Sequence, residues 1–326
     1  MLTGIGGPAA QAFIASFDPG TVDWFVADMD PLMPGFQLFP PDRRGVIPRG
    51  DDQSFVRALL SLALTAGADV VVPTVDSELL PVARNRRHFS RQGIHVLAAS
   101  VPTLEVCLDK LHLVEKLTGV VDVPVTHQLD ESFDPAGLKG RVVMKPRSGS
   151  GGRGVHVFDT AAEISADLPF DGSIIVQEFL PGAEYSIDVL ASKTGRIVAA
   201  VPRERIRVDS GIAVAARSVH DQRLIDFGIA VAQAIGLTTA ANVQAKLRED
   251  GTPALLEVNP RFPGTMSLTV ASGVNMPELA LTDLLGGVIP ERAAFRETVM
   301  VRTWADHLVD PASYGRSGLV ATDRVA

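Results

Sequence analysis

Two neighbouring segments in the C-terminal half carry oxygen-bearing side chains at a spacing that suits a metal ion. Glu257 and Asn259 are two residues apart, so in a strand both project from the same face. Gln244 lies on the preceding apolar segment, and the turn at 249–252 predicts that the two segments form an antiparallel hairpin. A carboxylate and two amide oxygens suit Mg²⁺. Arg261, two residues after Asn259, would face the anion that the metal ion binds. The alternative is a solvent-facing polar stripe.

A glycine-rich stretch, KPRSGSGGRG at 145–154, follows a predicted strand at 141–145. Its glycines are Gly149, Gly151, Gly152 and Gly154. Glycine lets the backbone approach a phosphate closely, and successive N–H groups can cradle the phosphate oxygens. Lys145 would add a point charge for the same phosphates. No Gly-Lys-Ser/Thr follows the glycines, so this is not the Walker pattern, and a flexible surface loop is the alternative.

Two further stretches place polar groups beside strands. At 177–186 a strand leaves through a Pro-Gly turn into another strand, a hinge whose backbone could read an adenine edge while Glu184 binds a ribose hydroxyl. Arg203, Arg205 and Arg207 would share one face of a regular strand, ahead of a turn that ends at Gly211, and could clamp a substrate carboxylate. The alternatives are a plain turn with surface glutamates and a solvated basic edge.

The elements that must hold these groups change character along the chain. Up to about residue 108, apolar strands at 22–27, 69–73 and 94–97 alternate with helices that begin near 51 and 77, which predicts a parallel α/β sheet. Strands expected at 141–145, 155–158 and 173–178 indicate a small α+β lobe. Longer strands are expected at 184–191, 197–202, 240–248 and 254–258, with a final helix over 276–285. After about Phe295 no motif can be interpreted.

Composition narrows the class of protein. The chain has 326 residues, enough for two or three packed subdomains, and 46% of them are hydrophobic, as in globular proteins. Asp and Glu outnumber Lys and Arg by 38 to 30, and the resulting net charge of −8 argues against binding to nucleic acid or to anionic membranes. The single cysteine, Cys107, excludes an internal disulfide framework and fits a cytoplasmic protein. The charge-free stretch at 227–245 is expected to be a buried helix followed by a buried strand rather than a membrane span.

Together these motifs resemble the ATP-grasp superfamily, and within it the branch typified by the large subunit of carbamoyl-phosphate synthase. The resemblance runs from about residue 1 to 290 and also rests on three N-terminal stretches: TGIGGPA at 3–9, VPTVDSEL at 72–79 and LDK at 108–110. It implies an ATP-grasp fold preceded by a Rossmann-like parallel-sheet domain. The domain boundaries expected on this basis are 1–108 for the Rossmann-like domain, 109–180 for the small lid subdomain and 181–326 for the C-terminal subdomain with the metal site.

The resemblance also implies a role for each matching residue. Lys110 and Lys145 would be the two nucleotide-phosphate lysines, and the loop from Gly149 to Gly154 the lid over the phosphates. The adenine would be read at Glu178 and Leu180, chiefly by backbone, and the ribose by Glu184. The metal ligands would be Gln244, Glu257 and Asn259, although the family more often has glutamate where this chain has Gln244. The remaining expectations are Arg261 for the transferring phosphoryl group and Arg203, Arg207 and Gly211 for the substrate.

The activity implied is that of an ADP-forming ligase that uses ATP and Mg²⁺, with Mn²⁺ as a substitute metal. It would activate a carboxylate as an acyl phosphate and join it to an amine, giving an amide bond of the amino-acid or peptide type. Two alternatives stay open: phosphorylation of bicarbonate or carbamate as in carbamoyl-phosphate synthase, and a non-catalytic ATP-binding regulatory protein. The expected partners are ATP and small carboxylate and amine substrates, with a homodimer as one option and neither nucleic acid nor membrane among them.

Overall fold

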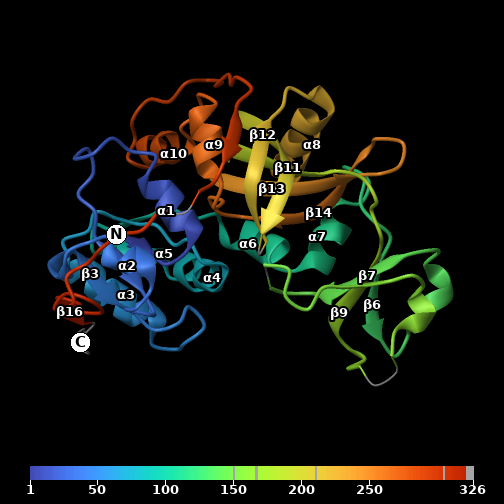
Figure 1. Cartoon of the computed structure of the whole chain (residues 1–326), viewed down its shortest axis with the longest axis horizontal. Coiled ribbons are helices and arrows are strands. Elements are labelled where there is room, and N and C mark those ends of the chain that lie inside the picture. The colour runs from blue at the N-terminus through green and yellow to red at the C-terminus, as the bar shows by residue number, and fades with distance from the viewer. Residues whose placement is uncertain (150, 166–167, 210, 304, 321–326) are drawn as a thin grey trace.

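The computed structural model describes residues 1–149, 151–165, 168–209, 211–303 and 305–320. Its first part forms a parallel sheet (Figure 1) of β1 (Leu2–Thr3), β2 (Val26–Asp28), β3 (Arg44–Val46) and, from the far end of the chain, β16 (Leu319–Val320). β4 (Val70–Val71) and β5 (His95–Val96) pair in parallel, and a bridge between Leu2 and Val72 joins them to β1. The predicted parallel sheet is confirmed.

Helices surround this sheet. They are α1 (Pro8–Ile14), α2 (Pro34–Gln37), the short 3-10 helix η1 (Pro41–Arg43), α3 (Phe55–Thr65), α4 (Asp76–Arg84), α5 (Arg86–Ser90) and α6 (Val101–Cys107). The next helix, α7 (Lys110–Leu117), buries Leu113 and Leu117 in the core of the large sheet described below. In α3, Phe55, Leu59 and Leu62 recur at helical spacing and are buried, so the apolar stripe faces the core. The strand expected at 22–27 pairs only from Phe25 onward, because β1 offers it a partner of two residues.

The middle of the chain forms a small antiparallel lobe. Its strands are β6 (Thr126–Asp130), β7 (Val142–Pro146), β8 (His156–Phe158) and β9 (Asp171–Glu178), in the order β6-β9-β7-β8, with the 3-10 turns η2 (Pro135–Gly137) and η3 (Ala161–Glu163). Leu129, Val142 and Val176 are fully buried at its centre. The lobe stands apart from the N-terminal sheet in Figure 1, with α6 and α7 between them and the largest sheet above.

That largest sheet has the order β14-β13-β10-β11-β12-β15. Its strands are β10 (Glu184–Ala191), β11 (Ile197–Asp209), β12 (Ile212–Ser218), β13 (Ala240–Leu247), β14 (Pro253–Asn259) and β15 (Val299–Val301), and the helices α8 (Gln222–Ala234), α9 (Met266–Ala271) and α10 (Met276–Leu284) pack beside it. The antiparallel hairpin expected between 240–248 and 254–258 is confirmed. β11 runs seven residues past the predicted end at 202, to Asp209.

The two faces of this sheet differ in polarity. Ile187, Val189 and Val243 point to one face, where they join a core with Phe227 and Val231 of α8. Burial of each such side chain contributes about 1.5–3 kcal/mol. Thus the stretch at 227–245 is a buried helix and a buried strand, as expected, and in the described part of the chain no helix is both long and apolar enough to cross a membrane. The opposite face of the sheet carries polar side chains.

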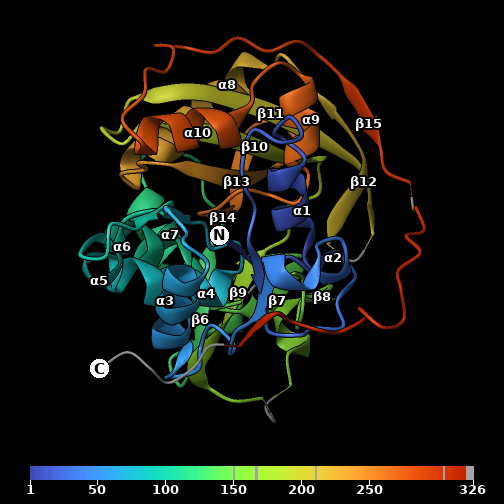
Figure 2. The ribbon, with the colours of Figure 1, turned by 90° about the vertical axis from the view of Figure 1, so that its left-hand side faces the viewer.

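The last described residues return to the first sheet. In Figure 2 the segment after β15 runs along the edge of the molecule and down past α2 to the N-terminal sheet. Arg44 of β3 is almost fully buried and receives this segment, because its guanidinium donates to the carbonyl oxygens of Ser313 and Arg316 as well as to that of Phe36. β16 then pairs with β3 in parallel.

Candidate nucleotide and metal site

A cleft of about 770 Å³ lies where the N-terminal sheet, the small lobe and the polar face of the large sheet meet. This volume is in the range of pockets that hold small molecules and cofactors. The expected site residues that line it are Lys110, Lys145, Gly149, Gly151, Gly152, Glu178, Leu180, Glu184, Gly211, Gln244, Glu257, Asn259 and Arg261. The chain thus brings together groups that are up to 151 positions apart, as with Lys110 and Arg261.

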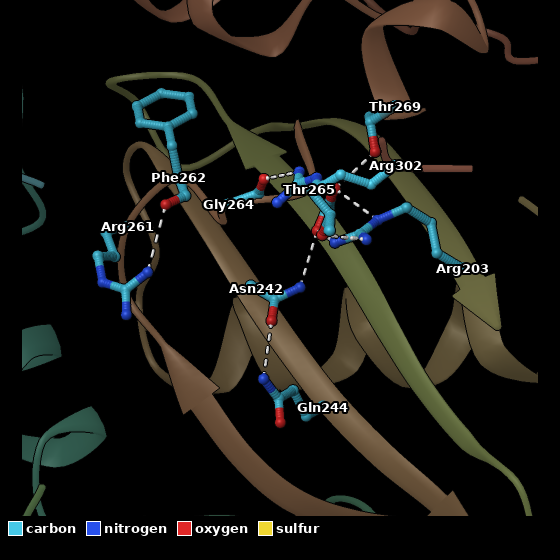
Figure 3. Close-up of polar contacts among 10 residues, drawn as sticks. Arg203, Asn242, Gln244, Arg261, Phe262, Gly264, Thr265, Thr269 and Arg302 are labelled. Carbon is cyan, nitrogen blue, oxygen red and sulfur yellow. Dashed lines mark hydrogen bonds and ion pairs between the residues drawn. The ribbon is translucent and has the colours of Figure 1, made fainter. Parts of the chain in front are cut away.

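The three expected metal ligands share one face of the hairpin. Gln244 on β13 pairs directly with Glu257 on β14, and Asn259 lies two residues further along β14, opposite Asn242. Asn259 Nδ2 donates to Glu257 Oε1 at 3.0 Å. Figure 3 shows the second contact, in which Gln244 Nε2 donates to Asn242 Oδ1 at 3.2 Å. Because each amide nitrogen is engaged by a neighbour, the amide oxygens and the carboxylate are the atoms left for a cation.

This donor set fits Mg²⁺, which takes oxygen ligands and few protein groups when phosphates supply the rest. Among the described residues there is no group of three or more His, Cys, Asp or Glu side chains that could hold a metal ion. A cation here would therefore depend on one carboxylate, two amide oxygens and the oxygens of a bound phosphate.

Two lysines approach the same carboxylate. Lys145, on β7, is 5% exposed, and its Nζ donates to the carbonyl oxygen of Leu256 at 3.3 Å. Burial lowers the pKa of Lys145 to about 8, although the charge of Glu257 acts to raise it. Burial also lowers the pKa of Lys110, at the start of α7, against the opposing effects of Glu257, Asp76 and Asp109. Two desolvated cations beside one carboxylate form a site that favours further negative charge.

The glycine-rich loop lines the cleft and is held at its N-terminal end. Gly149, Gly151, Gly152 and Gly154 all have positive φ, between 69° and 113°, a conformation that favours glycine. Lys110 Nζ donates to the carbonyl oxygen of Gly149 at 2.6 Å. Arg147 binds Asp109 with two nitrogens, and Asp109 also caps α7. Ser150 lies outside the described residues.

The far side of this loop meets the turn between β11 and β12. A Cβ placed on Gly211, whose φ is +78°, would lie 3.6 Å from the carbonyl oxygen of Gly151. Arg205 Nη2 donates to the carbonyl oxygen of Gly211 at 2.9 Å, which ties the turn to its own strand. The neighbouring Ser210 lies outside the described residues. The glycine loop and this turn therefore meet beside the cleft that both of them line.

The expected adenine and ribose groups lie at the hinge between β9 and β10. Leu180 is buried, and Glu178 Oε1 lies 2.7 Å from Nη1 of Arg248, which also binds Asp122. Glu184 forms an ion pair with Arg205 at 2.9 Å, and the buried Arg205 Nε has no hydrogen-bond partner among the described residues. Both glutamates are thus held by arginines at the edge of the cleft.

Arg261 crosses to the N-terminal domain. Its Nε lies 2.6 Å from Asp76 Oδ1 and its Nη2 lies 3.2 Å from Asp76 Oδ2. Asp76 is the first residue of α4 and lines the same cleft. The arginine expected at the transferring phosphoryl group is therefore positioned by an acid 185 residues away in sequence.

The basic strand differs from the regular strand assumed from the sequence. β-bulges lie between Arg205 and Arg207 and between Arg207 and Val208, so alternation of the side chains breaks there. Arg203 is fully buried and bound by both oxygens of Asp188, so its guanidinium is already neutralised. Arg207 is exposed, and neither Arg203 nor Arg207 lines the cleft, whereas Arg205 does. Gly154 likewise lies just beyond the cleft lining.

Sequence reasoning missed three residues that line this cleft or support it. Asn242 precedes Gln244 by two positions, so the same period-2 rule that grouped Glu257 with Asn259 could have included it. Asp76 and Asp188 carried no such signal, because their partners Arg261 and Arg203 come from distant elements.

Comparison with known proteins agrees with this geometry. A family model described as "ATP-grasp in the biosynthetic pathway with Ter operon" matches residues 171–307. A D-alanine–D-alanine ligase of Thermotoga sp. (strain RQ2) is 31% identical over 107 residues, which are 32% of this chain. The match spans 35% of that ligase, about a third of its length.

Solved structures match over most of the chain. A carboxyaminoimidazole ribonucleotide synthase from Aspergillus clavatus, complexed with ATP, has a TM-score of 0.71 at 17% identity and covers 89% of this chain and 77% of its own. An L-amino acid ligase from Bacillus licheniformis has a TM-score of 0.69 at 16% identity, over 88% of this chain and 74% of its own. At these identities the likeness shows the fold. Residues 171–307 thus match an ATP-grasp family model, and the chain has the ATP-grasp fold, preceded by a Rossmann-like parallel sheet.

Proposed function

We propose that this chain is an ATP- and magnesium-dependent ligase that activates a carboxylate as an acyl phosphate and joins it to an amine. The observation that carries the proposal is the convergence of Lys110, Lys145 and the oxygen trio at Gln244, Glu257 and Asn259 in one cleft. Such a set neutralises and orients a polyphosphate, which is most of what phosphoryl transfer requires. Two relatives named above are amino-acid ligases by name, and this supports amide formation.

The nucleotide would lie between the small lobe and the large sheet. Leu180 and the hinge backbone would meet the adenine, Glu184 would meet the ribose, and the glycine loop would cover the phosphates. Lys145 and Lys110 would bind phosphate oxygens, and phosphate binding would hold the proton on Lys145, whose pKa is about 8 in the free chain. Mg²⁺ on Gln244, Glu257 and Asn259 would supply charge neutralisation between phosphate oxygens.

The reaction would run in two steps. A carboxylate oxygen attacks the γ-phosphorus in line, the bond from that phosphorus to the β–γ bridging oxygen breaks, and ADP leaves. The amine nitrogen then attacks the acyl carbon, loses a proton and displaces phosphate, giving the amide. Arg261, fixed by Asp76, would face the transferring group from the N-terminal side. Closure of the loop and the turn over the cleft would keep water from the acyl phosphate.

The test is ADP release measured with purified protein, ATP and Mg²⁺, first with pairs of amino acids and then with bicarbonate alone. Amine-dependent release, with an amide product identified by mass spectrometry, is the expected result. Release with bicarbonate alone would support the carboxylate-phosphorylating alternative, and binding without release would support the regulatory one.

Glu257→Ala is expected to abolish turnover while the circular dichroism spectrum is unchanged. Glu131→Ala, an exposed acid on the small lobe, is the matched control and should keep wild-type turnover. Wild-type turnover in Glu257→Ala would remove the metal assignment. The homodimer stays a prediction that light scattering on the purified protein can check.

A further inference from the structure

A fully buried carboxylate, Asp188 of β10, lies behind the proposed metal site on the same face of the sheet. It accepts from Arg203 Nε at 2.9 Å and Nη2 at 2.6 Å, from Asn242 Nδ2 at 2.8 Å and from Thr269 Oγ1 at 2.5 Å. A carboxylate bound to a guanidinium in this way can only accept hydrogen bonds. Every neighbour of Asp188 must therefore present a donor to it.

This requirement passes along β13 to the metal site. Asn242 has to turn its NH₂ group toward Asp188, so its oxygen Oδ1 faces the other way, toward Gln244 (Figure 3). Gln244 then has to turn its own NH₂ toward Oδ1 of Asn242, which leaves Oε1 as the free end of the amide. The reverse orientation of either amide would set oxygen against oxygen or nitrogen against nitrogen.

We propose that Asp188 and Asn242 form a positioning relay that orients Gln244 so that its oxygen, and not its nitrogen, is presented to the cation. The proposal rests on the proposed function, since it assumes a cation at Gln244, Glu257 and Asn259. A carboxylate at position 244 would need no such help, because both of its ends can ligate a metal. An amide group ends in an oxygen and an NH₂ group of nearly equal size, and only the oxygen can bind a metal ion. A chain with glutamine at this position therefore needs a neighbour that fixes which of the two groups faces the cation.

The experiment is a double-mutant cycle on metal affinity. Mn²⁺ is titrated into the ADP-bound protein and the free ion is followed by electron paramagnetic resonance, a readout independent of turnover. Asn242→Ala is expected to weaken Mn²⁺ binding about 10-fold, the usual cost of removing an outer-shell partner. In the Gln244→Ala background the same change should have no further effect, because the amide to be oriented is gone.

Thr269→Val is the matched control, because Thr269 is equally buried and bonds the same carboxylate on a path that does not reach Gln244. It should leave Mn²⁺ affinity within about 2-fold of wild type, in keeping with sites that do not couple. If Asn242→Ala does not fold, Asn242→Ser is the second variant: its shorter side chain keeps a hydroxyl group but no longer places an acceptor at the position of Oδ1, which meets Gln244, and the same loss is expected.

Two results would overturn the relay: unchanged affinity in Asn242→Ala or Asn242→Ser, or an equal loss with and without Gln244. Glu257→Ala separates this failure from that of the proposed function. If Glu257→Ala also keeps wild-type Mn²⁺ affinity, the metal site itself is absent. If Glu257→Ala loses Mn²⁺ while the cycle is additive, the site exists and only the relay is refuted.

Discussion

Replacement of Lys145 by methionine should stabilise the free protein at neutral pH even as it weakens nucleotide binding. The lysine is buried beside Glu257 and Lys110, and burial lowers its pKa from 10.5 to about 8. At pH 7 the side chain is protonated in both the folded and the unfolded chain, so the folded state bears the cost of a desolvated charge. That shift corresponds to about 3 kcal/mol.

The sign of the pH dependence follows from where the proton is lost. Above pH 8 the folded chain releases the Lys145 proton before the unfolded chain does, so the unfolded chain binds more protons and stability rises with pH up to about 10.5. Between pH 7 and 9.5 about 2 kcal/mol of the cost disappears in the wild type. A methionine has no proton to lose, so its advantage over lysine should shrink by that amount.

The assay is urea unfolding followed by circular dichroism at pH 7 and pH 9.5 for wild type, Lys145→Met and the exposed control Lys139→Met. Lys145→Met should exceed wild type at pH 7 by up to about 3 kcal/mol and by about 1 kcal/mol at pH 9.5. Lys139→Met should show a small difference that is the same at both values. An advantage of Lys145→Met that does not change with pH would refute the reasoning.

Four other outcomes are expected. At pH 8.5, ATP binding should be accompanied by proton uptake, because phosphate binding should raise the pKa of Lys145. Calorimetry in two buffers of different ionisation enthalpy measures the proton uptake, and equal binding heats in both buffers would contradict it. Burial raises the pKa of Glu78 to about 7, so wild-type stability should fall as pH rises from 4.5 to 7. Glu78→Gln should remove this pH dependence of the urea midpoint, and the same pH dependence in both proteins would contradict the prediction. Asp76→Asn should lower kcat about 10-fold while ATP affinity stays constant, because Arg261 loses its fixed position; a change in ATP affinity alone would contradict it. Gly35→Ala places a Cβ 2.0 Å from the carbonyl oxygen of Ile5 and should cost at least about 2 kcal/mol in thermal unfolding, and an unchanged melting temperature would contradict it.

Local sequence patterns predicted the parts of the site whose residues lie close together in sequence. Alternation of side chains along a strand placed Glu257 and Asn259 on one face, and a short turn fixed Gln244 beside them. The glycines of the loop were recognisable because positive φ and close backbone approach select that residue. Roles for these residues in binding and catalysis remain predictions until the variants are measured.

The missing parts depend on packing between distant elements. Alternation of side chains along the strand predicted that Arg203 would face a substrate. In the structure, Thr265 and Thr269, which follow β14 in the chain, pack against Arg203 and its partner Asp188, so the arginine is buried. The bulges in β11 have no fixed residue signature. β15 and β16 are too short to show periodicity, which is why the tail after Phe295 yielded no motif.

The pairing of β16 with β3 joins two segments that are synthesised far apart in time. As the chain leaves a ribosome, β1, β2 and β3 emerge early, but the outer edge of β3 has no partner until β16 follows more than 270 residues later. During that time Arg44 lacks the carbonyl oxygens of Ser313 and Arg316, and an open strand edge invites pairing with other chains. The N-terminal sheet is therefore complete only once β16 has emerged, long after the rest of its strands.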